Sequence, residues 1–199
     1  MLVRVVCAVA LILGPVAPAY AAGAMPAPSA AASAHCPEMA LLHVDQLPAS
    51  AWAPVDYPSG AEAALRAKAG DAHPIAGPSV HVFRQDQADG RTVSVVAEKS
   101  GSGWTLWVAD TRGGAAKAHK VALRADRAHT LDRILADACF WAEPTDLSTQ
   151  PADAACPDAM EVHDEALVRE GRRSAVQHCS PAGLTGQLAG VLWNGADVE

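Results

Sequence analysis

The middle of the chain contains three segments in which apolar and polar residues alternate. They cover residues 80–86, 91–99 and 104–110, and they are rich in β-branched and aromatic side chains. A period of two is typical of strands that bury one face. A fourth strand is predicted over residues 118–124, after the turn at Gly113-Gly114. The pattern therefore predicts an antiparallel β-meander of four strands.

The turns between these segments predict how the strands pair. Asp89-Gly90 is a strong signal for a two-residue hairpin turn, because both turn positions favour positive φ. This turn would place His81 opposite Glu98, and a loop over residues 100–103 would place Val96 opposite Trp107. On this register the core face holds Val82, Val93, Val95, Ala97, Leu106 and Val108, and the other face holds His81, Phe83, Ser94, Val96, Glu98, Thr105 and Trp107.

Helical periodicity is found on both sides of the meander. A helix is predicted near residues 60–69, where Ser59 and Glu62 have the spacing of a capping box and Gly70 ends the helix. A second is predicted near residues 126–139, with Asp126 as its N-cap. A last helix begins at Pro181, after Ser180, and runs to about Trp193. The apolar stripes are Leu131, Ile134, Leu135 and Ala138 in the second helix and Leu184, Leu188, Val191 and Leu192 in the last.

The last helix also carries small residues at four-residue spacing. Ala182, Gly186 and Gly190 share one face, and a glycine inside a helix costs roughly 0.5–1 kcal/mol relative to alanine. We expect close packing of that face against the sheet or another helix to compensate for this cost.

The segment before the last helix fits two patterns. Asp158 and Glu161 have capping-box spacing and Gly171 is placed to end a helix, whereas the residues up to Cys179 also read as a hairpin that turns at Glu170-Gly171. We expect the hairpin. The fold class predicted for the chain is α+β: an antiparallel β-meander plus a C-terminal hairpin, with two or three helices packed on the sheet.

The N-terminus has the pattern of an export signal. Arg4 precedes an apolar run over residues 5–13, and Ala19-Tyr20-Ala21 places small residues where a signal peptidase reads them. The run is much shorter than the roughly 20 residues that span a bilayer. We therefore expect a signal peptide over 1–21, a flexible leader over 22–35 and a single α+β domain over 36–199. The mature protein is expected to be soluble, periplasmic or secreted, and free of a membrane anchor.

The expected compartment indicates how the cysteines pair. Cys7 leaves with the signal, and Cys36, Cys139, Cys156 and Cys179 remain. An even number of cysteines in an oxidising compartment predicts two disulfides, and four cysteines allow three connectivities. We expect Cys36 to pair with Cys139 and Cys156 to pair with Cys179. One disulfide with two buried thiols is the alternative.

Charge and motifs exclude several functions. Removal of Arg4 leaves a net charge of 14 − 22 = −8, whereas nucleic acids and anionic membranes attract basic surfaces. The sequence lacks Gly-x-Ser-x-Gly, Ser-x-x-Lys, His-Glu-x-x-His, a P-loop and Gly-x-Gly-x-x-Gly. No catalytic set, metal site or cofactor is therefore predicted.

The mixed face of the meander offers one candidate binding site, formed by His81, Phe83, Trp107 and Glu98. Such a face is ordinarily covered by a helix, which would leave the His–Glu pair as a contact at its rim. Left exposed, an aromatic pair with polar neighbours would form a recognition patch.

The C-terminal third contains Cys139-Phe140-Trp141, Cys156-Pro157-Asp158, Gly171-Arg172-Arg173 and Cys179-Ser180-Pro181. This block resembles small, uncharacterised exported proteins of Gram-negative bacteria, a resemblance that favours the hairpin followed by a helix and implies no activity. We expect a non-enzymatic exported binding or inhibitor-like protein, whose partner is another envelope protein. The alternatives are a small envelope hydrolase with a His/carboxylate site and a structural envelope accessory protein.

Overall fold

The computed structural model describes residues 36–42, 44–75, 78–86, 90–111, 114–147, 163–169, 173–178 and 183–197. Short 3₁₀ helices come first: η1 (Pro37–Leu42), η2 (Val44–Gln46) and η3 (Ala49–Trp52). The helices are α2 (Ser59–Lys68), α3 (Ala125–Ala136), α4 (Ala138–Ala142) and α5 (Gly183–Ala196). The strands are β1 (Ser79–Asp86), β2 (Thr92–Ser100), β3 (Gly103–Asp110), β4 (Lys117–Ala122), β5 (His163–Arg169) and β6 (Arg173–His178).

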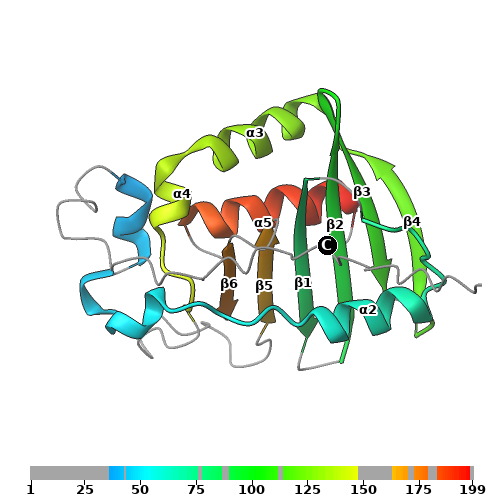
Figure 1. The fold of residues 1–199 in the computed structure, drawn as a ribbon, viewed down its shortest axis with the longest axis horizontal. Helices are drawn as coiled ribbons and strands as arrows, with labels where there is room; N and C mark the ends of the chain where they lie inside the picture. The colour runs from blue at the N-terminus through cyan, green and yellow to red at the C-terminus, as the bar shows by residue number, and fades with distance from the viewer. Residues whose placement is uncertain are drawn as a thin grey trace, which may run out of the picture.

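The strands form one six-stranded antiparallel sheet in the order β4-β3-β2-β1-β5-β6 (Figure 1). The meander is confirmed, and so is the C-terminal hairpin. The hairpin extends the sheet because β5 pairs with β1. The helical alternative for residues 158–171 is wrong over 163–169, and the predicted α+β class is confirmed.

The predicted register is confirmed for one strand pair and wrong for another. Val96 pairs with Trp107 as expected. His81, however, pairs with Val96, and Ser79 takes the place opposite Glu98. The prediction was therefore wrong by two residues. A shift of two keeps every side chain on its own face, so the alternation of apolar and polar residues cannot distinguish these two registers.

The main core lies between one face of the sheet and helices α3 and α5. The predicted core-face residues are all buried in it, together with Leu131, Ile134, Leu184, Leu188 and Leu192. α3 ends at Ala136 because Asp137 has extended backbone and caps α4, where it accepts a hydrogen bond from the Cys139 N–H. The expected continuation of this stripe to Ala138 is therefore wrong, and Ala138 is exposed. Asp126 lies in the first turn of α3 and Arg124 occupies its N-cap position.

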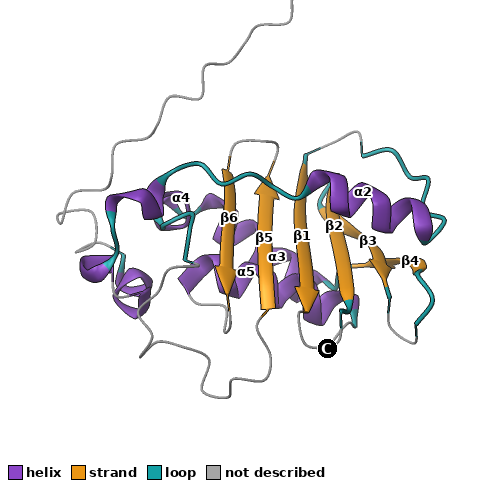
Figure 2. Ribbon diagram, turned by 90° about the horizontal axis from the view of Figure 1, so that it is seen from below, coloured by secondary structure: helices purple, strands orange, loops and turns teal. Residues whose placement is uncertain are grey.

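A second layer covers part of the opposite face of the sheet. Figure 2 shows α2 in front of the sheet, with α3 and α5 behind it. A smaller apolar cluster joins Leu65 of α2 to Phe83 of β1 and Ala109 of β3. The two sides of the sheet are therefore covered by different helices, and α2 lies on the side that carries the predicted binding residues.

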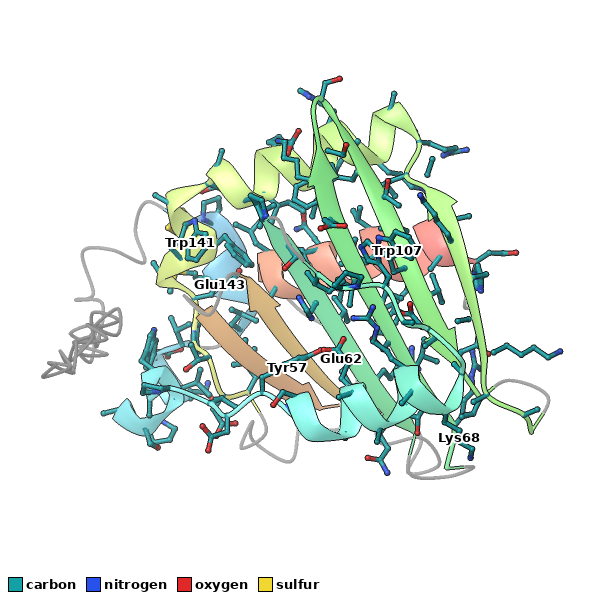
Figure 3. The ribbon with its side chains drawn as sticks, turned by 45° about the vertical axis from the view of Figure 1, so that its right-hand side comes forward. Tyr57, Glu62, Lys68, Trp107, Trp141 and Glu143 are labelled. Atoms are coloured by element: carbon teal, nitrogen blue, oxygen red, sulfur yellow. A yellow bond between two sulfur atoms is a disulfide. The ribbon has the colours of Figure 1, made fainter. Side chains whose placement is uncertain are left out.

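The start of α5 is held by a buried carboxylate. Glu143 is 1% exposed and accepts hydrogen bonds from the Leu184 and Thr185 N–H groups and from the Thr185 hydroxyl. Figure 3 shows Glu143 beside Trp141 at the α4 end of the sheet. A negative charge at a helix N-terminus satisfies free N–H groups and opposes the helix dipole favourably. Gly183 begins this helix at φ +66, where a Cβ would lie 2.5 Å from Glu143 Oε1.

Gly195 of α5 is closely packed, whereas Gly190, on the face that the small residues share, is not. A Cβ at Gly190 would meet open space, so the expected compensation is wrong there. At Gly195, by contrast, a Cβ would lie 2.5 Å from Leu123 Cδ1 and 3.1 Å from Leu106 Cδ1. Small residues four positions apart lie on one face of the helix. Which glycine is closely packed, however, depends on where Leu106 and Leu123 contact α5.

A disulfide joins Cys36 to Cys139, as predicted, with Cα atoms 5.5 Å apart. It links the start of η1 to α4 across 103 residues of sequence. Cys156 and Cys179 lie outside the described residues, as do the expected signal peptide over 1–21 and leader over 22–35. Within the described ranges, no helix combines the length and apolar character needed to cross a bilayer.

Replacing both Cys36 and Cys139 by alanine should lower the free energy of unfolding by roughly 2–5 kcal/mol, because the bridge closes a long loop. Urea unfolding of the mature chain measures this loss. Cys156→Ala with Cys179→Ala provides the matched comparison, and non-reducing peptide mapping tests the second predicted bridge. Unchanged stability of the Cys36/Cys139 variant would contradict a structural role for the bridge.

Replacing Gly190 and Gly195 of α5 by alanine should change the stability of the protein in opposite directions. Gly190→Ala should stabilise the protein by about 0.5–1 kcal/mol, because the new methyl meets open space and alanine favours the helix. Gly195→Ala should destabilise it by about 1–3 kcal/mol, because buried leucines must move. Thermal and urea unfolding measure both changes, and equal effects of the two substitutions would refute this assignment.

Candidate functional site

The predicted binding residues share one face of the sheet but do not form an open patch. Phe83 is 4% exposed and packs against Leu65 of α2. Trp107 is half-buried, and its ring stacks on His73, with centroids 3.5 Å apart and planes 9° apart. α2 therefore covers Phe83, whereas His73, from the segment that follows α2, covers the Trp107 ring.

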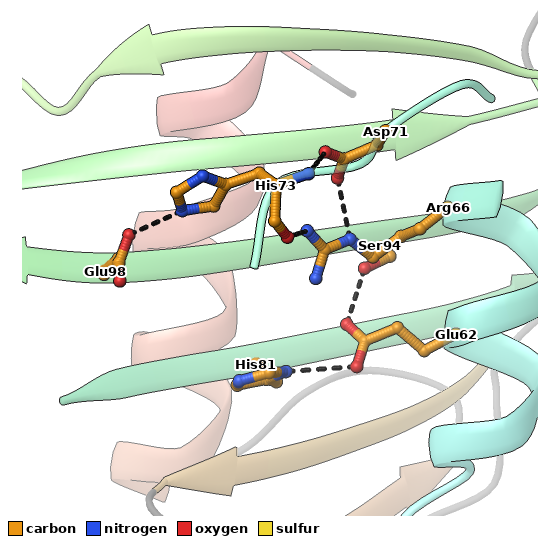
Figure 4. A network of polar contacts seen from close by, with 7 residues as sticks. All are labelled: Glu62, Arg66, Asp71, His73, His81, Ser94 and Glu98. Atoms are coloured by element: carbon orange, nitrogen blue, oxygen red, sulfur yellow. Dashed lines mark hydrogen bonds and ion pairs between the residues drawn. The ribbon is translucent and has the colours of Figure 1, made fainter. Parts of the chain in front are cut away.

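Two His–Glu pairs replace the expected pair between His81 and Glu98. His81 Nδ1 lies 3.0 Å from Glu62 Oε2, and Glu98 Oε2 lies 2.8 Å from His73 Nε2 (Figure 4). Glu62 comes from α2, and His73 comes from the segment that follows this helix. Both partners therefore reach the sheet face from the covering layer.

Glu62 is the buried carboxylate of this network. Its residue is 6% exposed, and its second oxygen accepts a hydrogen bond from Ser94 Oγ at 2.6 Å. Burial acts to raise the pKa of this carboxyl, but the hydrogen bond and charge of His81 and the bond from Ser94 outweigh burial and lower the pKa below its usual range. Glu62 is therefore an ionised group that links α2 to β1 and β2.

Tyr57 lies beside the Glu62 carboxylate. Figure 3 shows Tyr57 and Glu62 next to each other between α2 and the sheet. Burial, followed by the negative charge of Glu62, raises the pKa of the Tyr57 hydroxyl far above its usual range. The hydroxyl makes no hydrogen bond of normal geometry to a described residue. Tyr57 therefore stays neutral beside this carboxylate.

The segment after α2 is tied back to the helix. Arg66 Nε donates to Asp71 Oδ2 at 2.7 Å, and Arg66 Nη2 donates to the His73 carbonyl oxygen at 3.0 Å. Burial acts to raise the pKa of Asp71, but the hydrogen bonds from Arg66 and from the His73 N–H, together with the Arg66 charge, outweigh burial and lower that pKa. These contacts hold the His73 ring over Trp107. We call residues 57–75 the covering segment.

Sequence reasoning missed Glu62 as a site residue because it assigned this side chain to a capping box. In the structure the Glu62 N–H bonds to the Pro58 carbonyl, and Ser59 lies inside the helix. The expected capping box is therefore wrong, because the carboxylate turns to the sheet instead. His73 gave no local signal, since its partners are 25 and 34 positions away in the chain.

Ser79, His81 and Glu62 form a line of hydrogen bonds. Ser79 Oγ lies 3.0 Å from His81 Nε2, and the other ring nitrogen faces Glu62. A hydroxyl, an imidazole and a carboxylate in this order form the activating chain of serine hydrolases. Ser79 is, however, only 5% exposed. The line therefore anchors α2 on the sheet, and its hydroxyl is closed to a substrate in this conformation.

The β4 strand forms an exposed edge of the sheet, in contrast to the buried cluster around Glu62. Its residues are exposed except for half-buried Val121. The Leu123 N–H donates to the Trp104 carbonyl, which makes this a hydrogen-bonded pair of the β3–β4 ladder. Hydrogen-bonded pairs alternate with non-bonded pairs in an antiparallel ladder. The main-chain N–H and C=O groups that point away from β3 therefore belong to Ala118, Lys120 and Ala122.

Basic side chains lie along this edge. Lys117, His119 and Lys120 are exposed, and Lys120 Nζ lies 4.7 Å from the centroid of the Trp107 ring. The indole Nε1 of Trp107 is buried and makes no hydrogen bond to the described residues. Within those residues no group of three or more His, Cys, Asp or Glu side chains is arranged to hold a metal ion.

The depressed pKa of Glu62 predicts an acid-sensitive contribution to stability. A carboxyl whose pKa is lower in the folded state stabilises the fold above its unfolded pKa, and this stabilisation is lost as the pH falls through the folded pKa. Glu62→Gln should lower the free energy of unfolding at pH 7 by roughly 1–3 kcal/mol and should flatten its dependence on pH below about 4.5.

Urea unfolding between pH 7 and pH 3 measures this effect. Asp56→Asn provides the matched control, because Asp56 is exposed and lies in the loop between η3 and α2. This control should change neither the stability nor its pH dependence. Parallel pH profiles for Glu62→Gln and the wild type would contradict the role assigned to the carboxylate.

No protein-family model, curated protein sequence or solved structure matches this chain. The resemblance of the block from Cys139 to Pro181 to small exported proteins of Gram-negative bacteria therefore stays a prediction. The geometry of the covering segment and of the β4 edge is what supports an inference about function.

Proposed function

We propose that this protein is an exported, non-enzymatic binding protein that recognises another envelope protein. Its recognition element is the β4 edge of the sheet. The observation that carries this proposal is the exposed outer strand, whose main-chain groups at Ala118, Lys120 and Ala122 point away from β3. Such an edge can accept an added strand, which is a common mode of peptide recognition.

The closed polar cluster supports a binding role over a hydrolytic one. Its carboxylate already accepts bonds from His81 and Ser94, and the hydroxyl nearest to a histidine is buried. A hydrolase needs a reacting group that substrate can reach. These groups fix the covering segment, and the polar main-chain groups of β4 remain exposed to a partner.

The scaffold suits a binding surface. The Cys36–Cys139 bridge and the core under α3 and α5 give the sheet a fixed geometry, and β4 pairs with β3 along its whole length. A preorganised edge loses little conformational entropy when a partner strand is added. The expected export signal and the disulfide both agree with a partner in the cell envelope.

Ala118→Pro tests this proposal. Proline removes the outward-pointing N–H of residue 118 but leaves intact the β3 hydrogen bonds, which belong to the neighbouring residues. We expect a partner that the wild-type mature chain captures from envelope extract to be lost with this variant. Quantitative mass spectrometry of the captured proteins measures the loss.

Ala118→Ser is the matched control, because it keeps both the N–H and a small side chain. It should capture the same partner as the wild type. The far-UV circular dichroism and the unfolding midpoint of both variants must match the wild type, which shows that the sheet is intact. Equal capture by Ala118→Pro and Ala118→Ser would refute the edge as the recognition element. Absence of any specific, saturable partner would favour the structural accessory role.

A further inference from the structure

We propose that the β4 edge takes an extended acidic segment of its partner as an additional antiparallel or parallel strand. This inference rests on the proposed function, and it names the chemistry of the partner. It is carried by the coincidence of outward main-chain groups with exposed basic side chains on the same six-residue strand.

The main chain fixes the extended form of the partner. Outward N–H and C=O groups recur at every second residue of β4, from Ala118 to Ala122. Only a segment in β conformation presents its own N–H and C=O groups with this repeat. A helix satisfies its main-chain groups internally and could not use the edge in this way.

The side chains of β4 determine which charge we expect on the partner strand. Lys117 and Lys120 are exposed on β4, whereas the mature chain as a whole is strongly acidic, with 14 basic and 22 acidic residues after removal of Arg4. The Trp107 ring lies beneath the Lys120 ammonium group and restricts where that charge can lie. Acidic side chains on an added strand would lie directly opposite these cations.

The same charges discourage other occupants. A second copy of the chain that paired β4 with β4 would bring lysines of the two edges close together, and like charges on adjacent strands destabilise the pair. Lysines on an edge strand also protect against pairing with uncharged strands. The edge is therefore selective for an acidic strand, because it rejects neutral and basic ones.

The space beside the edge also fits a strand. Ala118 and Ala122 flank Lys120 on the face that carries Trp107, and both have small side chains. A partner residue opposite either alanine has room for a branched or aromatic side chain, whereas the residue opposite Lys120 meets the cation. The preferred segment therefore places an acidic residue between two bulkier residues on this face.

The experiment uses the full mature chain and three capped strand-forming peptides of about eight residues, the length of an ordinary strand. The three peptides carry the same Val and Thr residues at every second position. They differ only in the residues between these positions, which are Glu, Gln or Lys. Calorimetry at low salt measures affinity, and amide chemical shifts locate the binding. The Glu peptide should bind roughly 10-fold more tightly than the Gln peptide, and the Lys peptide should not bind measurably.

Variants separate charge from strand addition. Lys117→Glu with Lys120→Glu should invert the preference, so that the Lys peptide binds better than the Glu peptide. Lys68→Glu, on the last residue of α2, is the matched charge control and should keep the preference of the wild type. Ala118→Pro should weaken the Glu peptide to the level of the Lys peptide. Raising the salt to 0.5 M should weaken the Glu peptide several-fold.

The outcomes distinguish this inference from the proposed function. Equal binding of all three peptides, lost with Ala118→Pro, would overturn the acidic preference and leave the edge as the binding element. Binding of the Glu peptide that persists in Ala118→Pro would overturn strand addition. Self-association that Ala118→Pro abolishes would identify a second copy as the occupant and overturn the inference. Failure of all three peptides to bind would overturn it as well, whereas loss of the captured partner in Ala118→Pro would still support the edge.

Discussion

The burial of the Glu62 carboxylate is the constraint on which the covering layer of this protein depends. An ionised carboxylate loses its hydration when it is buried, so it is tolerated only where hydrogen bonds and opposite charge replace the water. Here the replacements come from His81 and Ser94, on two adjacent strands. α2 can therefore lie on the sheet in only one position, in which one carboxylate reaches both strands. Once α2 is fixed, the segment that follows it carries His73 to Trp107 and Glu98.

A second buried carboxylate holds a helix at the other end of the molecule. Glu143 is buried at the start of α5, where it accepts main-chain N–H groups that the first turn leaves unpaired. The Cys36–Cys139 bridge joins α4, which precedes Glu143, to the start of the described chain. Each buried carboxylate thus fixes one helix to its surroundings, α2 on one face of the sheet and α5 on the other. In both places the hydrogen bonds of the carboxylate position a helix.

This use of the polar side chains is the reason that the proposed binding site lies at an edge of the sheet. One face of the sheet lies under α3 and α5 and part of the other under the covering segment, and β4 forms one edge, where every residue except half-buried Val121 is exposed. An edge strand is ordinarily a liability, because it attracts other strands. Lysines on the edge reduce that liability for neutral strands. In the proposed binding mode, recognition of an acidic strand rests on the main chain of β4 and on Lys117 and Lys120.

The sequence by itself determined the elements and their faces. The alternation in residues 80–110 places Val82, Val95 and Leu106 in the core and Phe83 and Trp107 on the other face, because a strand repeats every two residues. The last helix also followed from its apolar period. The hairpin at 163–178, however, was one of two patterns that the segment fits, and the Cys36–Cys139 pairing was one of three possible connectivities. What the tertiary structure decided is which polar groups meet. The register between β1 and β2 was free to shift by two residues, since both registers keep the same faces. The partners of His81, Glu98 and Trp107 come from 57–75, and no local period encodes a contact between a helix and a sheet. Glu62 has the spacing of a capping residue, and only the presence of His81 and Ser94 on the sheet beneath it makes the buried, ionised state more favourable than the cap.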